Sequence, residues 1–317
     1  MDKNILITGG AGFIGSHTAE ALLERGEKVI VLDNFNDFYD PKVKENNVAP
    51  HLEDPNYKLI RADIRDNESL AKTFTNNKID AVIHIAALAG VRPSIDRPKD
   101  YIETNIIGTL NIIEQMRIHN VKKLIFASSS SVYGNCKADK FSENLDVSEP
   151  ISPYAMTKKS CEELITVYHK LYNINAVCLR FFTVYGPRQR PDLAINKFAG
   201  LIESGQPIPV FGDGSNRRDY TFVADIVCGI LAALDYNKTG FEIINLGGGD
   251  PVSLERMINV LESTLGKKAV IDRKPMQPGD VDKTVCDWEK ANRLLGYAPK
   301  VNFESGITEF VKWLRSR

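Results

Sequence analysis

The sequence lacks the patterns that mark a secreted, metal-binding or membrane-spanning chain. Its five cysteines are odd in number and widely spaced, and no CxxC pair occurs, so neither a disulfide framework nor a metal site is indicated. No apolar run reaches the roughly 18 residues that suggest a transmembrane helix. A predicted strand begins at Ile5, which leaves no room for a signal peptide. We therefore expect a cytoplasmic chain with reduced thiols, no metal and no membrane partner.

An excess of charge of one sign is also missing. The 40 lysines and arginines nearly balance the 41 aspartates and glutamates, so the net charge is −1, and no long basic run occurs. Nucleic acid is therefore not an expected partner, because a basic patch is the usual basis for binding it. At 317 residues the chain is long enough to bury a large core in one large or two smaller domains.

Short apolar runs recur along the sequence, and helical patterns separate most of them. Continuous apolar strands that alternate with helices are typical of a parallel sheet covered on both faces, which is an α/β fold. The expected strands are residues 5–7, 29–32, 57–60, 81–85, 124–127, 177–179 and 241–246.

A glycine-rich loop follows the first of these strands and opens a predicted helix. Gly9, Gly12 and Gly15 are spaced three apart. Their missing side chains let the backbone approach a pyrophosphate, which then sits at the positive end of the helix. Asp33 closes the second strand, where a carboxylate accepts hydrogen bonds from both ribose hydroxyls of an adenosine. This context predicts a dinucleotide, and an acid with no neighbouring arginine favours NAD over NADP. The alternative is a tight turn with no ligand.

With a dinucleotide site at its start, the alternation predicts a Rossmann-type, doubly wound parallel sheet with a smaller, discontinuous C-terminal substrate lobe. The NAD-binding domain would comprise residues 1–181 plus about 222–248. The lobe would comprise about 182–221 plus 249–317, where loops are rich in proline, glycine and arginine.

Tyr154 and Lys158 stand four residues apart and so share one face of a helix. A free phenol ionises near pH 10, and lowering its pKa by about three units requires roughly 4 kcal/mol of phenolate stabilisation. A nearby ammonium group and an oxidised nicotinamide ring together could supply it. The pair therefore indicates redox chemistry at an alcohol carbon, although YxxxK also occurs often by chance.

These motifs together resemble an extended short-chain dehydrogenase/reductase, and more narrowly the NAD-dependent nucleotide-sugar epimerases. The match covers nearly the whole chain and includes Ser128–Gly134, Ala86–Gly90, Asn105 and Arg217–Thr221. The residues that the glycine loop, Asp33 and the resemblance indicate at the cofactor are Gly9, Gly12, Phe13, Ile14, Gly15, Asp33, Asn34, Asp63, Ile64, Ala86, Ala87, Ala89, Asn105, Tyr154 and Lys158. Asp63 alternatively caps a helix over residues 66–75.

The resemblance also implies catalytic roles. Tyr154 is the implied base, and Lys158 is its activator and a ribose ligand. Ser129 would hydrogen-bond the hydroxyl that is oxidised, assisted by Ser130 and Ser131. The alternative is that this run of serines merely caps or edges a strand.

Ser130 and Ser131 bear on the type of reaction. Dehydratases that resemble this chain carry Asp-Glu directly after the catalytic threonine, and UDP-glucuronate decarboxylases carry a glutamate two residues before the tyrosine of the VYG motif. A hydroxyl is a poor general acid or base at neutral pH, so both reactions are disfavoured and simple epimerisation remains. NAD would take hydride from C4 of a UDP-sugar and return it to the other face of a 4-keto intermediate.

The identity of the sugar rests on the segment Arg180–Ala194, which is similar to a signature of UDP-glucuronate 4-epimerases. UDP-galactose 4-epimerases usually have asparagine where Thr183 stands. A guanidinium fork can bind a uronate carboxylate at two points. Arg190 is the first candidate for it, and Arg188, which departs from the family's usual aromatic residue, is the second. Alternatively, either arginine is a solvated loop charge.

The other expected substrate contacts follow from the same resemblance. Arg218 aligns with a diphosphate ligand and Asp280 with a ribose ligand. Phe211 and Phe198 would pack near the uracil, or else in the core. The full expected substrate set is Ser129, Ser130, Ser131, Thr183, Arg188, Arg190, Phe211, Arg218 and Asp280.

The expected reaction is thus the conversion of UDP-glucuronate to UDP-galacturonate. The nearest enzyme alternative is a 4-epimerase for UDP-glucose or UDP-N-acetylglucosamine. An alternative outside catalysis is an NAD-binding module that senses redox state. The resemblance also implies a homodimer, paired through helices at about 98–118 and 153–172.

Overall fold

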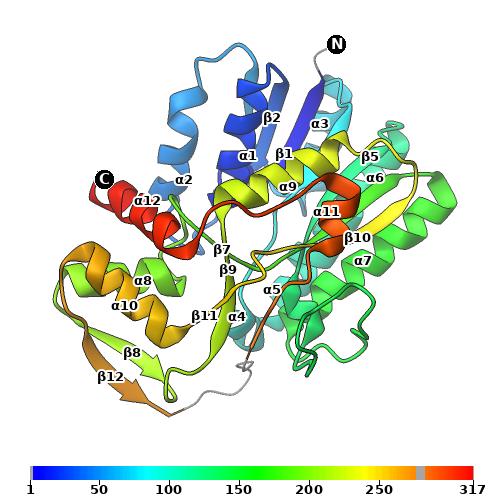
Figure 1. Cartoon of the computed structure of the whole chain (residues 1–317). Helices are drawn as coiled ribbons and strands as arrows, with labels where there is room; N and C mark the ends of the chain where they lie inside the picture. Colours follow the sequence, from blue (N-terminus) through cyan, green and yellow to red (C-terminus); the bar gives the residue numbers. More distant parts are fainter. Residues whose placement is uncertain (1–2, 276–282, 317) are drawn as a thin grey trace.

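A seven-stranded parallel sheet forms the centre of the computed structural model, which describes residues 3–275 and 283–316 (Figure 1). The strand order is β10-β6-β5-β4-β1-β2-β3. The strands are β1 (Asn4–Thr8), β2 (Lys28–Asp33), β3 (Tyr57–Arg61), β4 (Ala81–His84), β5 (Lys123–Ser129), β6 (Asn175–Phe181) and β10 (Phe241–Leu246). Every apolar run expected to be a strand belongs to this sheet, so the predicted Rossmann-type parallel α/β architecture is confirmed.

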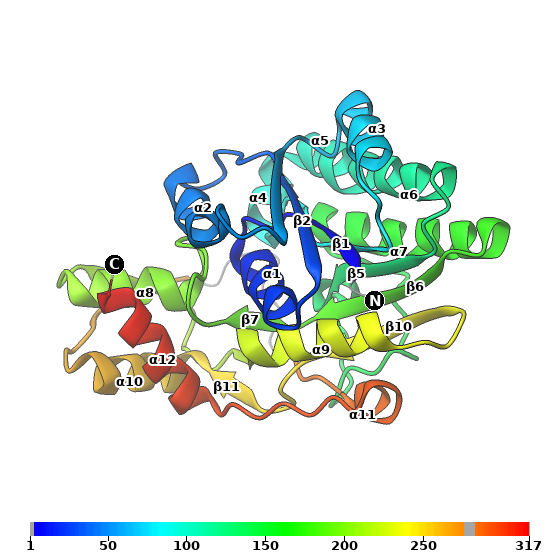
Figure 2. The ribbon, with the colours of Figure 1, turned by 90° about the horizontal axis from the view of Figure 1, so that it is seen from above.

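Helices cover both faces of the sheet (Figure 2). One face carries α1 (Phe13–Glu24) and α9 (Val223–Asp235), and the other carries α3 (Asn67–Asn76), α6 (Gly108–Ile118) and α7 (Pro153–Tyr172). Successive strand residues point to opposite faces. On β1, Ile5 and Ile7 therefore belong to one hydrophobic cluster and Leu6 to the other.

The remaining strands form two small sheets beside the large one. The three-stranded sheet contains β11 (Pro251–Ser253), β9 (Arg217–Phe222) and β7 (Thr183–Tyr185), and β12 (Val270–Lys274) pairs with β8 (Pro207–Phe211). The helices around them are α8 (Ala194–Glu203), α10 (Leu254–Leu265) and α12 (Phe303–Arg315). One hydrophobic cluster runs from Ile5 in the large sheet to Phe198 and Phe310 in this part. The division into an NAD-binding domain and a substrate lobe at the stated boundaries stays a prediction.

The start of α7 is fixed by its own sequence. The Ser152 side chain accepts a hydrogen bond from the Ala155 amide, and Pro153 occupies the first helical turn. Tyr154 and Lys158 therefore lie in the first two turns of one helix, as their spacing predicts. The shorter helices are α2 (Pro41–Val48), η1 (Ala49–His51), α4 (Val91–Asp96), α5 (Pro98–Tyr101), η2 (Ile102–Ile107), η3 (Ser130–Tyr133) and α11 (Glu289–Leu295).

No helix within residues 3–275 and 283–316 has the length and apolar character needed to cross a membrane. In the same part of the chain, no three His, Cys, Asp or Glu residues are grouped so that they could hold a metal ion.

Candidate active site

A cleft of about 330 Å³ opens at the carboxyl ends of the central strands, around the point where the strand order reverses between β1 and β4. Folds of this kind bind ligands at that edge. The expected cofactor residues that line it are Gly9, Gly12, Phe13, Ile14, Gly15, Asp33, Asn34, Ile64, Ala86, Ala87, Ala89, Tyr154 and Lys158. The expected substrate residues that line it are Ser129, Thr183 and Arg190.

The glycine loop packs too closely for a side chain at Gly9 and Gly15. A Cβ at Gly15 would lie 2.2 Å from the Gly9 carbonyl oxygen. A Cβ at Gly9, whose φ is +72°, would lie 2.7 Å from the Ala86 amide nitrogen. Gly12 precedes α1 and offers no side-chain cap, so the first amides of this helix are left for another partner. A bare helix start inside a glycine cradle fits the pyrophosphate of a dinucleotide.

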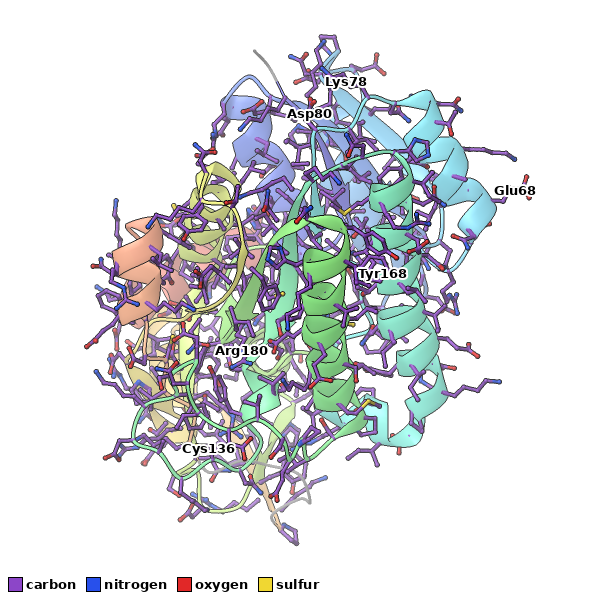
Figure 3. All side chains as sticks on the ribbon, turned by 90° about the vertical axis from the view of Figure 1, so that its right-hand side faces the viewer. Glu68, Lys78, Asp80, Cys136, Tyr168 and Arg180 are labelled. Atoms are coloured by element: carbon purple, nitrogen blue, oxygen red, sulfur yellow. The ribbon has the colours of Figure 1, made fainter. Side chains whose placement is uncertain are left out.

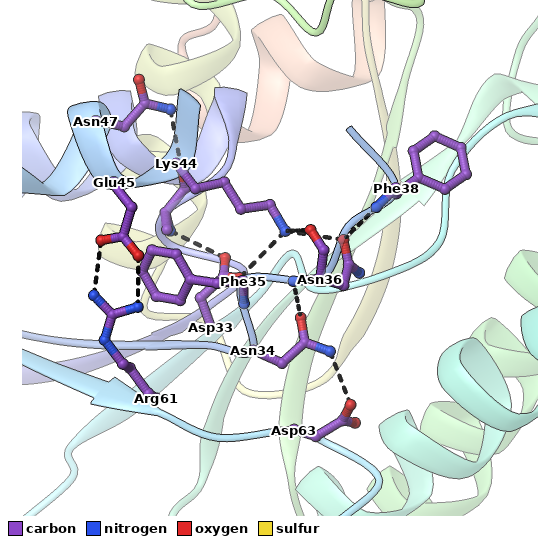
Figure 4. Close-up of polar contacts among 11 residues, drawn as sticks. Asp33, Asn34, Phe35, Asn36, Phe38, Lys44, Glu45, Asn47, Arg61 and Asp63 are labelled. Atoms are coloured by element: carbon purple, nitrogen blue, oxygen red, sulfur yellow. Dashed lines mark hydrogen bonds and ion pairs between the residues drawn. The ribbon is translucent and has the colours of Figure 1, made fainter. Parts of the chain in front are cut away.

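The Asp33 carboxylate is held in place by short-range contacts at one end of the cleft (Figure 4). It accepts hydrogen bonds from the amides of Phe35 (2.9 Å) and Ala11 (3.2 Å). Lys44 Nζ lies 3.5 Å from Asp33 Oδ1 and donates to Asn36 Oδ1 at 3.0 Å. Both members of the pair are buried. Sequence reasoning missed this cation, because nothing in the spacing shows that α2 folds back over the end of β2.

Asn34 and Asp63 form a second contact beside Asp33 (Figure 4). Asn34 Nδ2 donates to Asp63 Oδ2 at 2.8 Å, and Arg65 pairs with the same carboxylate. Partial burial raises the pKa of Asp63, but the hydrogen bonds from Arg65 and Asn34 outweigh it and lower the pKa to about 2. Asp63 does not line the cleft. The alternative role as a helix cap is wrong, because Asp66 caps α3 by accepting from the Glu68 and Ser69 amides.

Asn105 is also absent from the lining, and it acts on the cleft through a loop. It lies in the π-helical segment η2, a geometry that often marks functional sites. Its side chain accepts from the Leu88 amide (2.8 Å), and donates to the Leu88 carbonyl (3.0 Å) and to Thr157 Oγ1 (3.0 Å). Asn105 thereby fixes the loop that carries Ala86, Ala87 and Ala89 to the start of α7.

A buried histidine connects this loop region to β1, and sequence reasoning did not find it. The Thr109 hydroxyl donates to the Asn105 carbonyl, so it accepts from His84 Nε2, 3.0 Å away. His84 Nδ1 then accepts from the Thr8 hydroxyl at 2.6 Å. Burial lowers the pKa of His84 to about 3, so the ring is neutral at neutral pH.

Tyr154 and Lys158 both face the cleft from α7. Lys158 Nζ donates to the Ala127 carbonyl at 2.7 Å, and burial lowers the pKa of its ammonium group to about 8. Burial raises the pKa of Tyr154, and the hydrogen bond with Ser129 and the charge of Arg190 only partly offset this effect. The expected lowering by Lys158 is therefore not sufficient in the protein alone. Ionisation of Tyr154 needs more positive charge beside the phenol, such as an oxidised nicotinamide ring carries.

The serines after β5 do not act alike. Ser129 is largely buried, lines the cleft, and donates to Ser131 Oγ at 3.0 Å. Ser130 and Ser131 are not in the lining. Ser128 also lines the cleft, but its hydroxyl donates to Glu162 Oε1 on α7 at 2.6 Å. Glu162 is also paired at 2.8 Å with the buried Arg180, labelled in Figure 3, so this network fixes β5 against α7.

The two candidate arginines point to different places. Arg190 lines the cleft, where it donates to the Asp192 carboxylate (2.9 and 2.7 Å) and to the Ala89 carbonyl (3.3 Å). Arg188 is not in the lining, because its guanidinium group is bound by Glu20 and Ser16 on α1. The geometry therefore favours Arg190 over Arg188 as the residue that reaches a ligand.

Two further expected substrate residues, Phe211 and Arg218, do not line the cleft. Phe211 lies on β8 under the guanidinium of Arg92, 5.0 Å from its ring centre, and Arg218 is on β9. Phe198 is part of the hydrophobic core, as its alternative reading proposed. Asp280 lies outside the described residues.

Comparisons with known proteins show extensive similarity. A model of the GDP-mannose 4,6 dehydratase family matches residues 6–310. A UDP-glucuronate 4-epimerase of Thermodesulfobacterium geofontis is 43% identical over 309 residues, which are 97% of this chain and 95% of the relative. The crystal structure of UDP-glucuronic acid 4-epimerase from Bacillus cereus, in complex with UDP-glucuronic acid and NAD, is 38% identical. Its TM-score is 0.92, and 99% of each chain is covered. The Thermus thermophilus UDP-glucose 4-epimerase complex with NAD is 33% identical, with a TM-score of 0.90 and 98% and 99% of the two chains covered.

Proposed function

Because this chain belongs to the GDP-mannose 4,6 dehydratase family of extended short-chain dehydrogenases/reductases, we propose that it converts UDP-glucuronate to UDP-galacturonate. It is an NAD-dependent UDP-sugar 4-epimerase, and therefore an isomerase. The observation that carries the proposal is a single cleft in which Tyr154, Lys158 and Ser129 stand beside a glycine cradle.

The proposed chemistry assigns one task to each of these residues. NAD, when bound at the glycine cradle, would supply a reversible hydride acceptor for C4 of the sugar. Ser129 holds the C4 hydroxyl, and the Tyr154 oxygen takes its proton. Lys158 holds its ammonium charge near the phenolate and binds the nicotinamide ribose. Once the 4-keto sugar has turned over in the cleft, Tyr154 would give the proton back as the other face of the ketone is reduced.

The choice of a uronate is supported by Arg190. Its guanidinium group lines the cleft close enough to Tyr154 for its charge to lower that residue's pKa. Charge-assisted pairing with a C5 carboxylate suits this position, with Thr183 as a neutral donor nearby. The Arg190 guanidinium group pairs with the Asp192 carboxylate, so the carboxylate of a uronate would share or replace that pairing. A neutral UDP-hexose is the second candidate, because the Thermus thermophilus relative is a UDP-glucose 4-epimerase.

The proposed assembly is a homodimer in the cytoplasm. Helices α6 and α7 lie side by side (Figure 3), and both expose apolar side chains: Ile118 (58%) on α6, and Val167 (48%) and Leu171 (64%) on α7. Association through this face would bury them. The free cysteines of the described residues support a reducing compartment. Light scattering on the purified protein tests the dimer, and a mass of one chain of 35.4 kDa would contradict it.

The test of the function is product analysis without added NAD. The purified protein is incubated with UDP-glucuronate, and the product is identified by NMR. We expect UDP-galacturonate and no free NADH, because the cycle returns its own hydride. A 4-keto-pentose formed with stoichiometric NADH would instead identify an oxidative decarboxylase. Turnover of UDP-glucose alone would move the assignment to the neutral hexoses.

A further inference from the structure

We infer that Arg188 is a positioning residue. By binding α1, it holds the loop that carries Arg190 and so keeps Arg190 at the sugar. This inference rests on the proposed function and extends it. Arg188 does not line the cleft, so it would not touch a bound ligand directly. Its contacts point to the helix that begins at the glycine loop.

The guanidinium group of Arg188 joins two parts of α1. Its Nη2 donates to Glu20 Oε1 at 2.6 Å, and its Nη1 donates to Ser16 Oγ at 3.3 Å. Ser16 in turn donates to the carbonyl of Phe13, which lines the cleft at the start of the helix. One side chain therefore connects the first turn of the cofactor-facing helix to the loop that carries Arg190.

The backbone of Arg188 shows that this arrangement is imposed by its surroundings. Its φ is +63°, a left-handed conformation that residues with a Cβ seldom adopt. Such a conformation persists where neighbouring contacts over-determine it. It also turns the chain so that Arg188 points toward α1 while Arg190, two residues later, points into the cleft.

The residues on either side of Arg188 are anchored as well. The carbonyl of Pro187 lies 3.0 Å from His17 Nε2 on α1. Gln189 is buried, its side-chain Nε2 donates to the Val184 carbonyl at 3.2 Å, and its main-chain carbonyl accepts from Asn196 Nδ2. The loop is therefore held on both sides of Arg188, so a change in the backbone conformation of Arg188 would also displace Arg190.

The ion pair is charged at neutral pH. Burial raises the pKa of Glu20, but the hydrogen bond and charge of Arg188 outweigh it, and the pKa lies below its usual value. Glu20 Oε1 also lies 3.0 Å from His51 Nε2. Removing the Glu20 charge would free the Arg188 fork without altering either the cleft lining or the loop sequence.

The test is a double-mutant cycle that joins Glu20→Gln or Arg188→Gln with Arg190→Ala. For each variant, kcat and KM are measured with UDP-glucuronate and UDP-glucose. We expect Glu20→Gln and Arg188→Gln each to lower kcat/KM for the uronate about tenfold, mainly through KM, since residues that share a network couple at this level. UDP-glucose should change less than about twofold. In the Arg190→Ala background, neither Glu20→Gln nor Arg188→Gln should lower kcat/KM for UDP-glucuronate further.

Two controls separate positioning from general stability. Arg188→Lys should recover part of the uronate activity, because it keeps the cation for Glu20. Glu304→Gln removes a comparable ion pair, 2.8 Å long, between α12 and Arg256 on α10, and should leave kinetics unchanged. Additive losses in the cycle, or an equal fall for both sugars, would overturn the inference. If the wild type fails to epimerise UDP-glucuronate, the proposed function fails first and this inference fails with it, whereas additivity in an active enzyme refutes this inference alone.

Discussion

The two ends of the cleft are built in different ways. At the end formed by Asp33, the side chains of Asn34, Asn36 and Lys44 come from a single short stretch of chain that closes on itself (Figure 4). At the other end, Ser129, Tyr154, Thr183 and Arg190 come from β5, α7, β7 and the loop that follows β7. The first end depends on local sequence, and the second depends on the whole fold. The first should therefore tolerate changes made at the second.

Tyr154→Phe gives the largest separation between the two ends. Loss of the only evident base should lower turnover about 10²- to 10⁴-fold, the range typical of general acid–base groups. The amount of NAD bound per chain should stay close to the wild-type value, because the Asp33 end is untouched. Turnover and NAD content are measured on the same preparation. More than a tenth of normal turnover would show that the base has been misassigned.

Arg190→Ala tests whether the distant end selects the sugar. Charge-assisted hydrogen bonds contribute about 1.5–3 kcal/mol, so kcat/KM for UDP-glucuronate should fall roughly 10- to 150-fold. The value for UDP-glucose should change little. A trace of 4-keto-pentose is also expected, because a freed carboxylate beside a C4 carbonyl can leave as CO₂. Asp192→Asn is the control, because it removes the carboxylate that pairs with Arg190 but keeps the Arg190 guanidinium group. An equal fall for both sugars would end the carboxylate assignment.

Asp33→Asn makes the matching change at the first end. The lost charge should weaken NAD binding by a similar 10- to 150-fold, by the same range of about 1.5–3 kcal/mol. Because Lys44 stays bonded to Asn36, its cation remains near the ribose, and discrimination against NADP should narrow. Calorimetry with both dinucleotides measures this. Unchanged NAD affinity would mean that Asp33 supports its loop and does not bind the cofactor.

His84 lies behind the cleft, and its expected effect is on stability. The folded pKa is about 3 and the unfolded value is 6.5, so below pH 6.5 the unfolded state binds a proton that the folded state refuses. This contribution to stability is therefore complete above pH 6.5 and is lost as the pH falls toward 3, by at most about 1.4 kcal/mol per pH unit. His84→Gln should flatten this dependence. Urea unfolding at pH 7 and pH 5 measures the free energy of unfolding of both proteins. An equal fall between the two pH values in wild type and variant would contradict the prediction.

Much of the fold was predictable because its signals are local. Apolar runs identify strands, and each predicted run became a strand of the large sheet. The spacing of Gly9, Gly12 and Gly15 predicted the cradle, and at Gly9 and Gly15 only a residue without a Cβ fits. The four-residue spacing of Tyr154 and Lys158 placed both on one face of α7.

Contacts that depend on how the chain folds back on itself, or on burial, were not predictable in the same way. Lys44 approaches Asp33 only because α2 turns back over β2. The direction of the Tyr154 pKa shift follows from burial, which a sequence does not state. The same applies to Ser128 and Ser129, which neighbour each other in the chain: the first hydroxyl donates to Glu162 on α7, and the second donates to Ser131.

The pair of arginines marks the boundary most clearly. By itself, the sequence determined the order of the strands and helices, the glycine cradle, the tyrosine–lysine pair and the presence of two arginines near one end of the cleft, because spacing and periodicity act over a few residues. Only the tertiary structure decided that Arg190 faces the cleft while Arg188 binds Glu20. The reason is that a left-handed backbone at Arg188 and a carboxylate 168 positions away in the chain direct that side chain, and neither has a local signal.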